Sequence, residues 1–194
     1  MHPPPISSGR KACLRHNVRG FTAIELMVTV GIAAILAALA APSFTWLMER
    51  WRVRQAVEGL HSTLLYARSE AIKRNGNVMI QKLPNNTNGC TTASGNNNWD
   101  CGWQVLACDS INASGSCAGP ITLQRFDAPA KLVISRTSGG IRIILNRWGL
   151  VDGPFVGFNF IPQGKGIADP LAHGLCMSSG GRVRVIPDPP CTSG

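Results

Sequence analysis

The hydrophobic pattern is strongest near the N-terminus, where residues 21–41 are apolar except for Thr22, Glu25 and Thr29. As a helix rising about 1.5 Å per residue, this stretch reaches roughly 30 Å, the thickness of the hydrocarbon core of a bilayer. A signal-peptide core is shorter, about 7–15 residues. The pattern therefore predicts a membrane-spanning helix that is retained rather than lost on secretion.

Glu25 is the one acid in this apolar segment, and a carboxylate in lipid needs a partner. A cut between Gly20 and Phe21 creates an α-amino group one helical turn before Glu25. That cation could neutralise the acid in its own chain or in a neighbouring one.

Beyond Pro42 the apolar residues follow a helical period up to about residue 75. They are spaced alternately by four and three, which places them on one face of a helix: Val53, Val57, Leu60, Leu64, Ala67 and Ala71. Asn75 and Gly76 are typical of a helix C-terminus.

After Gly76 short apolar runs alternate with turn residues, and this pattern predicts strands. A loop rich in Asn, Thr and Gly is expected over residues 85–100, and residues 131–136 and 141–145 are expected to form a hairpin across 138–140. The fold class is thus α+β, with one long N-terminal helix packed on an antiparallel β-sheet domain. The expected strands are 77–83, 102–107, 121–126, 131–136, 141–145, 155–161, 175–177 and 182–186.

The formal net charge is +9, but residues 1–20 contribute four cations and no acid. The remaining basic excess is mild. It permits an anionic partner such as nucleic acid or lipid headgroups without requiring one.

Seven cysteines are present, and six of them follow the apolar segment. An even number beyond a membrane segment indicates disulfides formed in an oxidising compartment. Because each consecutive pair brackets a short, turn-rich loop, sequential pairing is favoured among the fifteen connectivities. No C-x-x-C occurs, so no metal site is expected; the expected disulfides are Cys90–Cys101, Cys108–Cys117 and Cys176–Cys191.

Catalytic chemistry finds little support in the sequence. After residue 20 the only histidines are His61 and His173, and no phosphate-binding Gly-rich loop occurs. Residues 115–119 (GSCAG) resemble a nucleophile elbow but lack its strand–turn–helix context. The chain is expected to be neither an enzyme nor a cofactor-binding protein.

The C-terminal segment 179–185 (SGGRVRV) carries the most specific binding signal. On a strand, Arg182 and Arg184 project to one face while Val183 and Val185 face the core. Two adjacent guanidinium groups suit phosphate oxygens, and a turn at residues 180–181 could bring backbone N–H groups near the same anion. A disulfide closing the surrounding loop is worth about 3 kcal/mol in the chain-entropy model. The alternative is an edge strand whose charges prevent aggregation.

Residues 20–22 (GFT) and 24–27 (IELM) resemble the processing motif of type IV pilins and type II secretion pseudopilins. The resemblance implies that a prepilin peptidase cuts after Gly20 and methylates the new amino group of Phe21, with Glu25 as the motif's acid. Residues 1–20 are then a cleaved leader, 21–42 a transmembrane and assembly helix, and 43–194 a globular domain that includes the second half of the helix. The N-terminus would begin in the cytoplasm, and the body would lie in the periplasm and later in an extracellular pilus fibre.

Residues 102–105 (GWQV), 147–149 (RWG) and 158–160 (FNF) are similar to the FimT/GspH family of minor pilins and pseudopilins. Residues 181–184 (GRVR) match the Gly-Arg-x-Arg motif of FimT-type minor pilins, which implies binding of double-stranded DNA in natural transformation. The implied partners are other major and minor pilins, the peptidase, the inner membrane and DNA. Two alternatives stay open: a minor pilin that only primes pilus assembly, and a type II secretion minor pseudopilin. Besides Gly181, Arg182 and Arg184, weaker candidates for DNA contact are Lys73, Arg74, Lys82 and Arg147.

Overall fold

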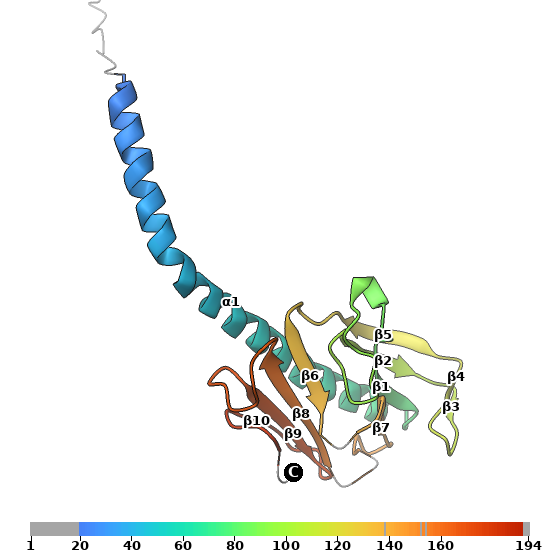
Figure 1. Ribbon diagram of the computed structural model, residues 1–194. Coiled ribbons are helices and arrows are strands. Elements are labelled where there is room, and N and C mark those ends of the chain that lie inside the picture. Colours follow the sequence, from blue (N-terminus) through green and yellow to red (C-terminus); the bar gives the residue numbers. More distant parts are fainter. Residues whose placement is uncertain (1–19, 138, 152, 154, 192–194) are drawn as a thin grey trace, which may run out of the picture. The chain divides into compact units, whose positions relative to one another are not determined.

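The computed structural model describes residues 20–137, 139–151, 153 and 155–191, without the side chains of residues 40–43. The chain divides into two compact units, residues 1–42 and 43–194. One helix, α1 (Ala23–Lys73), runs through both (Figure 1).

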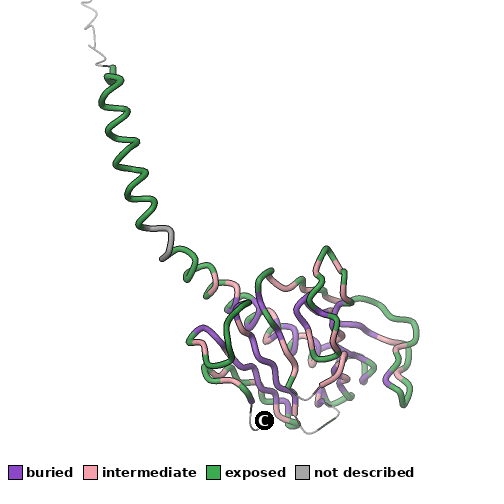
Figure 2. Tube along the Cα trace, viewed as in Figure 1, coloured by how far each residue is buried: buried purple, intermediate pink, exposed green. Residues whose placement is uncertain are grey.

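In the first unit, α1 begins with reciprocal hydrogen bonds between Thr22 and Glu25. The backbone N–H of Thr22 donates to Glu25 Oε2 (2.9 Å), and the backbone N–H of Glu25 donates to Thr22 Oγ1 (3.3 Å). This is a capping box, which satisfies the free N–H groups of the first turn. All described side chains up to Leu39 are exposed, as Figure 2 shows along this part of the helix.

Tested by length and composition alone, no single helix of the described residues qualifies as a membrane span. The same criteria are met only when two stretches are taken together as one interrupted span, Ala23–Leu39 and Phe44–Lys73.

In the second unit, α1 buries the predicted apolar stripe completely. Residues 53, 57, 60, 64, 67 and 71 are all at most 5% exposed. The helix ends where predicted: Asn75 and Gly76 have positive φ angles, and the N–H of Gly76 donates to the carbonyl of Ala71 (2.7 Å). This bond satisfies a carbonyl of the last turn.

The strands form two four-stranded antiparallel sheets rather than one. The first has the order β5-β2-β1-β7 and the second the order β10-β9-β8-β6 (Figure 1). In the first sheet the strands are β1 (Val78–Lys82), β2 (Trp103–Ala107), β5 (Ile121–Phe126) and β7 (Arg142–Leu145). In the second they are β6 (Leu132–Arg136), β8 (Phe155–Pro162), β9 (His173–Ser178) and β10 (Val183–Ile186). A small hairpin of β3 (Ser110–Ile111) and β4 (Cys117–Ala118) and a 3-10 turn, η1 (Thr87–Gly89), complete the domain.

The predicted hairpin between residues 131–136 and 141–145 is wrong. β6 pairs with β8, whereas β7 pairs with β1, so the glycine-containing link carries the chain from one sheet to the other. Arg136 turns inward at this link and donates Nη1 to the carbonyls of Gly140 and Arg142, which folds the chain around its side chain. Burial of Ile134 and Ile143 in the common core decided the pairing against the local hairpin signal.

The main apolar core joins the stripe of α1 to the inner faces of both sheets. Its largest fully buried side chains include Trp99, Trp103, Phe158 and Phe160. Trp103 donates Nε1 to Thr63 Oγ1 of α1 (3.0 Å). Trp99 comes from the segment that was expected to be only a loop, and its backbone N–H donates to Ile134 of β6 (2.8 Å). The loop therefore closes the edge of the second sheet.

The six described cysteines pair sequentially, in the order that the sequence favours. Cys90–Cys101 closes the long loop, Cys108–Cys117 closes the β3–β4 hairpin, and Cys176–Cys191 ties the C-terminal segment to β9. Their sequence separations are 11, 9 and 15 residues.

Candidate anion-binding site at the β9–β10 turn

The turn from β9 to β10 is held by backbone hydrogen bonds. The N–H of Ser178 donates to the carbonyl of Arg182 (2.9 Å), and the N–H of Gly181 donates to the carbonyl of Ser178 (2.8 Å). The N–H of Arg182 donates to Ser178 Oγ (3.2 Å). The N–H groups of Gly181 and Arg182 are thus used inside the turn, so of the two glycines expected to bring N–H groups to an anion, Gly181 already donates its own within the protein.

Arg182 immediately precedes β10, and Arg184 lies within it; both are exposed. Neither guanidinium has a hydrogen-bond or ion-pair partner among the residues that the structure describes. In the register of β10 on β9, Arg184 lies opposite Cys176, on the face away from the core, while Val183 lies opposite the buried Met177. Two cations that form no ion pair within the described residues thus lie at the edge of the second sheet.

Val185 was predicted to face the core, and its burial is less complete than that prediction implies. It lies opposite the fully buried Leu175, as expected for the core-facing side, yet 46% of it is exposed. The reason is the position of β10 at the edge of its sheet, where it has a strand neighbour on one side only.

The C-terminal segment returns across the second sheet after β10. Cys191 is bonded to Cys176 of β9, with 5.8 Å between their Cα atoms, and both residues are at most 6% exposed. A Cβ at Gly157 of β8 would lie 2.9 Å from Cys191 Cβ, and one at Gly174 would lie 2.7 Å from Ile186. The glycines let the segment pack directly on the sheet, which fixes β10 from its C-terminal side.

Arg68 of α1 contacts this turn, and the sequence did not predict the contact. Arg68 Nη1 donates to the carbonyl of Gly181, 113 residues away along the chain. No local signal marks this contact, because it depends on how the turn meets α1.

Lys73 and Arg74 lie at the end of α1 and share one acid. Lys73 Nζ is 3.5 Å and Arg74 Nε 2.7 Å from the carboxylate of Glu70. The hydrogen bond from Arg74 and the nearby Lys73 lower the pKa of Glu70, so it stays ionised. The acid offsets part of their charge, which makes both residues weaker candidates for a phosphate contact than Arg182 and Arg184.

Lys82 was predicted as a weaker candidate for contact with DNA, but the residue is only 8% exposed. Its Nζ donates to the carbonyls of Ala93 (2.7 Å) and Gly95 inside the long loop. Burial lowers the pKa of Lys82 and raises that of Asp100, whose Oδ1 accepts the N–H of Ile134 (2.6 Å). Lys82 therefore holds the loop in place, and its burial removes it from the candidate contacts with DNA.

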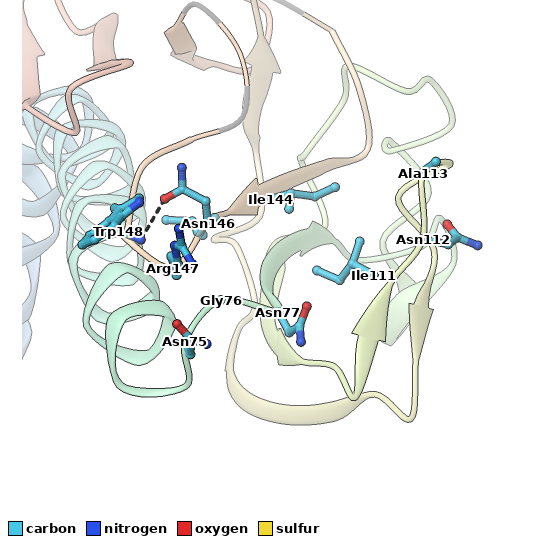
Figure 3. A pocket seen from close by; sticks show the side chains of 11 residues that line it. Asn75, Gly76, Asn77, Ile111, Asn112, Ala113, Ile144, Asn146, Arg147 and Trp148 are labelled. Atoms are coloured by element: carbon cyan, nitrogen blue, oxygen red, sulfur yellow. Dashed lines mark hydrogen bonds between the residues drawn. The ribbon is translucent and has the colours of Figure 1, made fainter.

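Arg147 lies on the loop after β7, beside an open cavity of about 560 Å³ (Figure 3). Asn146 fixes this loop, since its Oδ1 accepts the N–H groups of Trp148 (2.9 Å) and Leu150 (3.0 Å). The Arg147 guanidinium lies 5.2 Å from the centre of the exposed Trp148 ring. The cavity is lined by both polar and apolar residues, and Asn75, Asn77 and Asn112 are among the polar ones.

The predicted processing residues lie in the other unit, with Gly20 and Phe21 exposed before the first turn of α1. Glu25 serves there as the acid of the capping box. Its pairing with an amino group on Phe21 stays a prediction.

Comparison with known proteins defines the class. Residues 56–186 match the family described as type II transport protein GspH, and residues 15–41 match the prokaryotic N-terminal methylation motif. The solved structure of the type IV minor pilin FimU from Pseudomonas aeruginosa is similar at 26% identity and a TM-score of 0.55, covering 76% of this chain and 98% of that one. A second crystal form of FimU gives 25% identity and a TM-score of 0.52, covering 72% and 98%. No curated protein matches the chain.

The long helix packed on antiparallel sheets is the type IV pilin fold, and the N-terminal motif agrees with it. The chain belongs to the GspH family. Membership implies assembly with other pilins, as a structural subunit anchored by its apolar N-terminal helix.

Proposed function

We propose that this protein is a minor type IV pilin that binds double-stranded DNA through Arg182 and Arg184 and contributes to DNA uptake in natural transformation. The observation that supports this proposal is the pair of exposed guanidiniums, without a partner in the described structure, on a turn tethered by Cys176–Cys191. Arginines that only solubilise an edge strand need no such tether. Gly181 contributes the left-handed backbone, with φ of 80°, that shapes the turn.

The chemistry of the site favours phosphate over base edges. Guanidinium groups bind phosphate oxygens bidentately, and such contacts carry no sequence information. Binding should therefore be independent of sequence and should weaken steeply with salt as counterions are released. Arg147, also exposed, is a further candidate contact.

The test is titration of a labelled DNA duplex with the full chain in nonionic detergent, followed by fluorescence anisotropy across salt concentrations. R182Q/R184Q should weaken binding and make the slope of log K against log salt shallower by about 1.8, or 0.9 for each lost phosphate contact. R50Q/R54Q removes the same charge from exposed positions on α1 and should leave binding close to that of the parent. Parental affinity in R182Q/R184Q at moderate salt would exclude this site.

The N-terminal segment supports a second part of the proposal. A prepilin peptidase cleaves after Gly20, Phe21 receives a methyl group, and Glu25 pairs with the new amino group in the chain or its neighbour. Residues 21–42 then anchor the subunit in the inner membrane, with the body in the periplasm until the pilus forms. N-terminal sequencing of the membrane-bound chain should read from methylated Phe21, and a chain that still begins with the leader would contradict this.

The family description favours one rival, a minor pseudopilin of type II secretion. In that case the arginines serve solubility or contact with other subunits. A parent protein that does not bind duplex DNA even at low salt would favour this rival, or a minor pilin that only primes assembly.

A further inference from the structure

Arg68 makes a close contact with the β9–β10 turn that goes beyond one hydrogen bond. Besides the bond from Nη1 to the carbonyl of Gly181, the whole guanidinium lies against the glycine. A Cβ built at Gly181 would lie 2.6 Å from Arg68 Cζ and 2.7 Å from each of its terminal nitrogens. The backbone at this position favours glycine through its φ of 80°, and any side chain here would displace the Arg68 guanidinium.

The charge of Arg68 is not neutralised by a neighbouring acid. It is half-buried, and no carboxylate forms an ion pair with it within the described part of the chain. Its guanidinium offers five N–H donors, and Gly181 takes one of them. A partly desolvated cation without an acid partner is unfavourable by itself, and this one contacts Gly181, the residue before Arg182. An anion bound at the turn would supply the missing countercharge.

Arg68 also holds the turn on the side that the disulfide does not reach. β10 has a strand neighbour on one side only, and Cys176–Cys191 fixes the chain beyond its C-terminal end. Arg68 fixes the residue just before Arg182 by joining it to α1. Arg182 and Arg184 thus lie between two fixed points, which lowers the entropy that is lost when they bind a ligand.

We propose that Arg68 is the third guanidinium of the anion site: it positions the turn through Gly181 and adds its charge to that of Arg182 and Arg184 toward DNA phosphate. This inference rests on the proposed function, and it adds to the site a helix residue that lies outside the Gly-Arg-x-Arg segment.

Three variants separate positioning from charge in the anisotropy titration of the full chain. R68Q should bind the duplex about tenfold more weakly, with a salt slope shallower by about 0.9. R68K keeps the charge but loses the planar fork, so it should keep the parental slope and bind with intermediate affinity. G181A keeps all three arginines but displaces Arg68 from the turn, so it should weaken binding toward the affinity of R68Q.

R54Q is the matched control, because it removes one exposed arginine from the same helix about 21 Å away along the axis (14 residues at about 1.5 Å each). It should bind like the parent. Near-ultraviolet circular dichroism and the fluorescence of the buried Trp99 and Trp103 report whether each variant is folded. If R68Q does not fold, R68K and G181A decide the question.

The outcomes distinguish the two proposals. If R182Q/R184Q loses affinity while R68Q and G181A bind like the parent, Arg68 has no part in the site and the proposed function stands. If R182Q/R184Q also binds like the parent, the proposed function fails. If R68K and R68Q weaken binding equally with the parental slope, the charge of Arg68 does not act on DNA and that half of the inference is overturned.

Discussion

Breaking the Cys176–Cys191 bond tests whether the tether matters for binding or only for stability. The perturbation is C176A/C191A, which removes the bond without introducing a buried hydroxyl. The loop spans 15 residues, and the chain-entropy model assigns it about 3 kcal/mol. A domain of this size is typically stable by about 5–15 kcal/mol, so the variant should remain folded in the absence of denaturant.

The matched control is C108A/C117A, which opens the 9-residue loop at the β3–β4 hairpin. The same model assigns that loop about 2.6 kcal/mol. The two variants therefore lose nearly equal stability, but only the first frees the segment that follows Arg182 and Arg184. Any difference between them in DNA affinity reports on the tether rather than on global stability.

Two assays are needed. Urea unfolding followed by tryptophan fluorescence, to which the fully buried Trp99 and Trp103 contribute, should show similar losses of stability for the two variants. Anisotropy titration with duplex DNA should show weaker binding for C176A/C191A and parental binding for C108A/C117A. Equal affinity in both variants, whether lowered or unchanged, would refute the argument that the disulfide positions the arginines.

Two further predictions concern packing and burial. Gly59→Ala should destabilise the domain: its new Cβ would lie 2.4 Å from the ring of Phe126, and overpacking typically costs about 1–3 kcal/mol against a gain of about 1 kcal/mol in helix propensity. An increase in the urea midpoint of Gly59→Ala would contradict this. Lys82→Met should leave DNA affinity unchanged and lower stability by about 1–3 kcal/mol, because the carbonyls of Ala93 and Gly95 lose their donor. Weaker DNA binding by a folded Lys82→Met variant would return Lys82 to the candidate surface.

Local sequence was sufficient for the helix and for most strand positions. The buried stripe from Val53 to Ala71 follows the helical period, and the positive φ angles at Asn75 and Gly76 end the helix as predicted. The disulfides were also predictable, since each closes a loop of 9–15 residues. These features depend on residues that are close together along the chain.

Strand pairing was not predictable in the same way. The segments 132–136 and 142–145 are neighbours in sequence and have the residues of a hairpin, yet the first pairs with β8, later in the chain, and the second with β1, far earlier. Which strands pair depends on the apolar core that both sheets bury against α1. Residues from the whole domain contribute to that core.

For the candidate site, the sequence by itself determined the arginine pair, their alternation with Val183 and the loop that Cys176 and Cys191 close. Only the tertiary structure decided which cations face solvent: it buried Lys82 and brought Arg68 to Gly181. The physical reason is the same in both cases. A long side chain takes its direction from the carbonyls and charges around it, and those groups come from segments that meet only when the chain has folded.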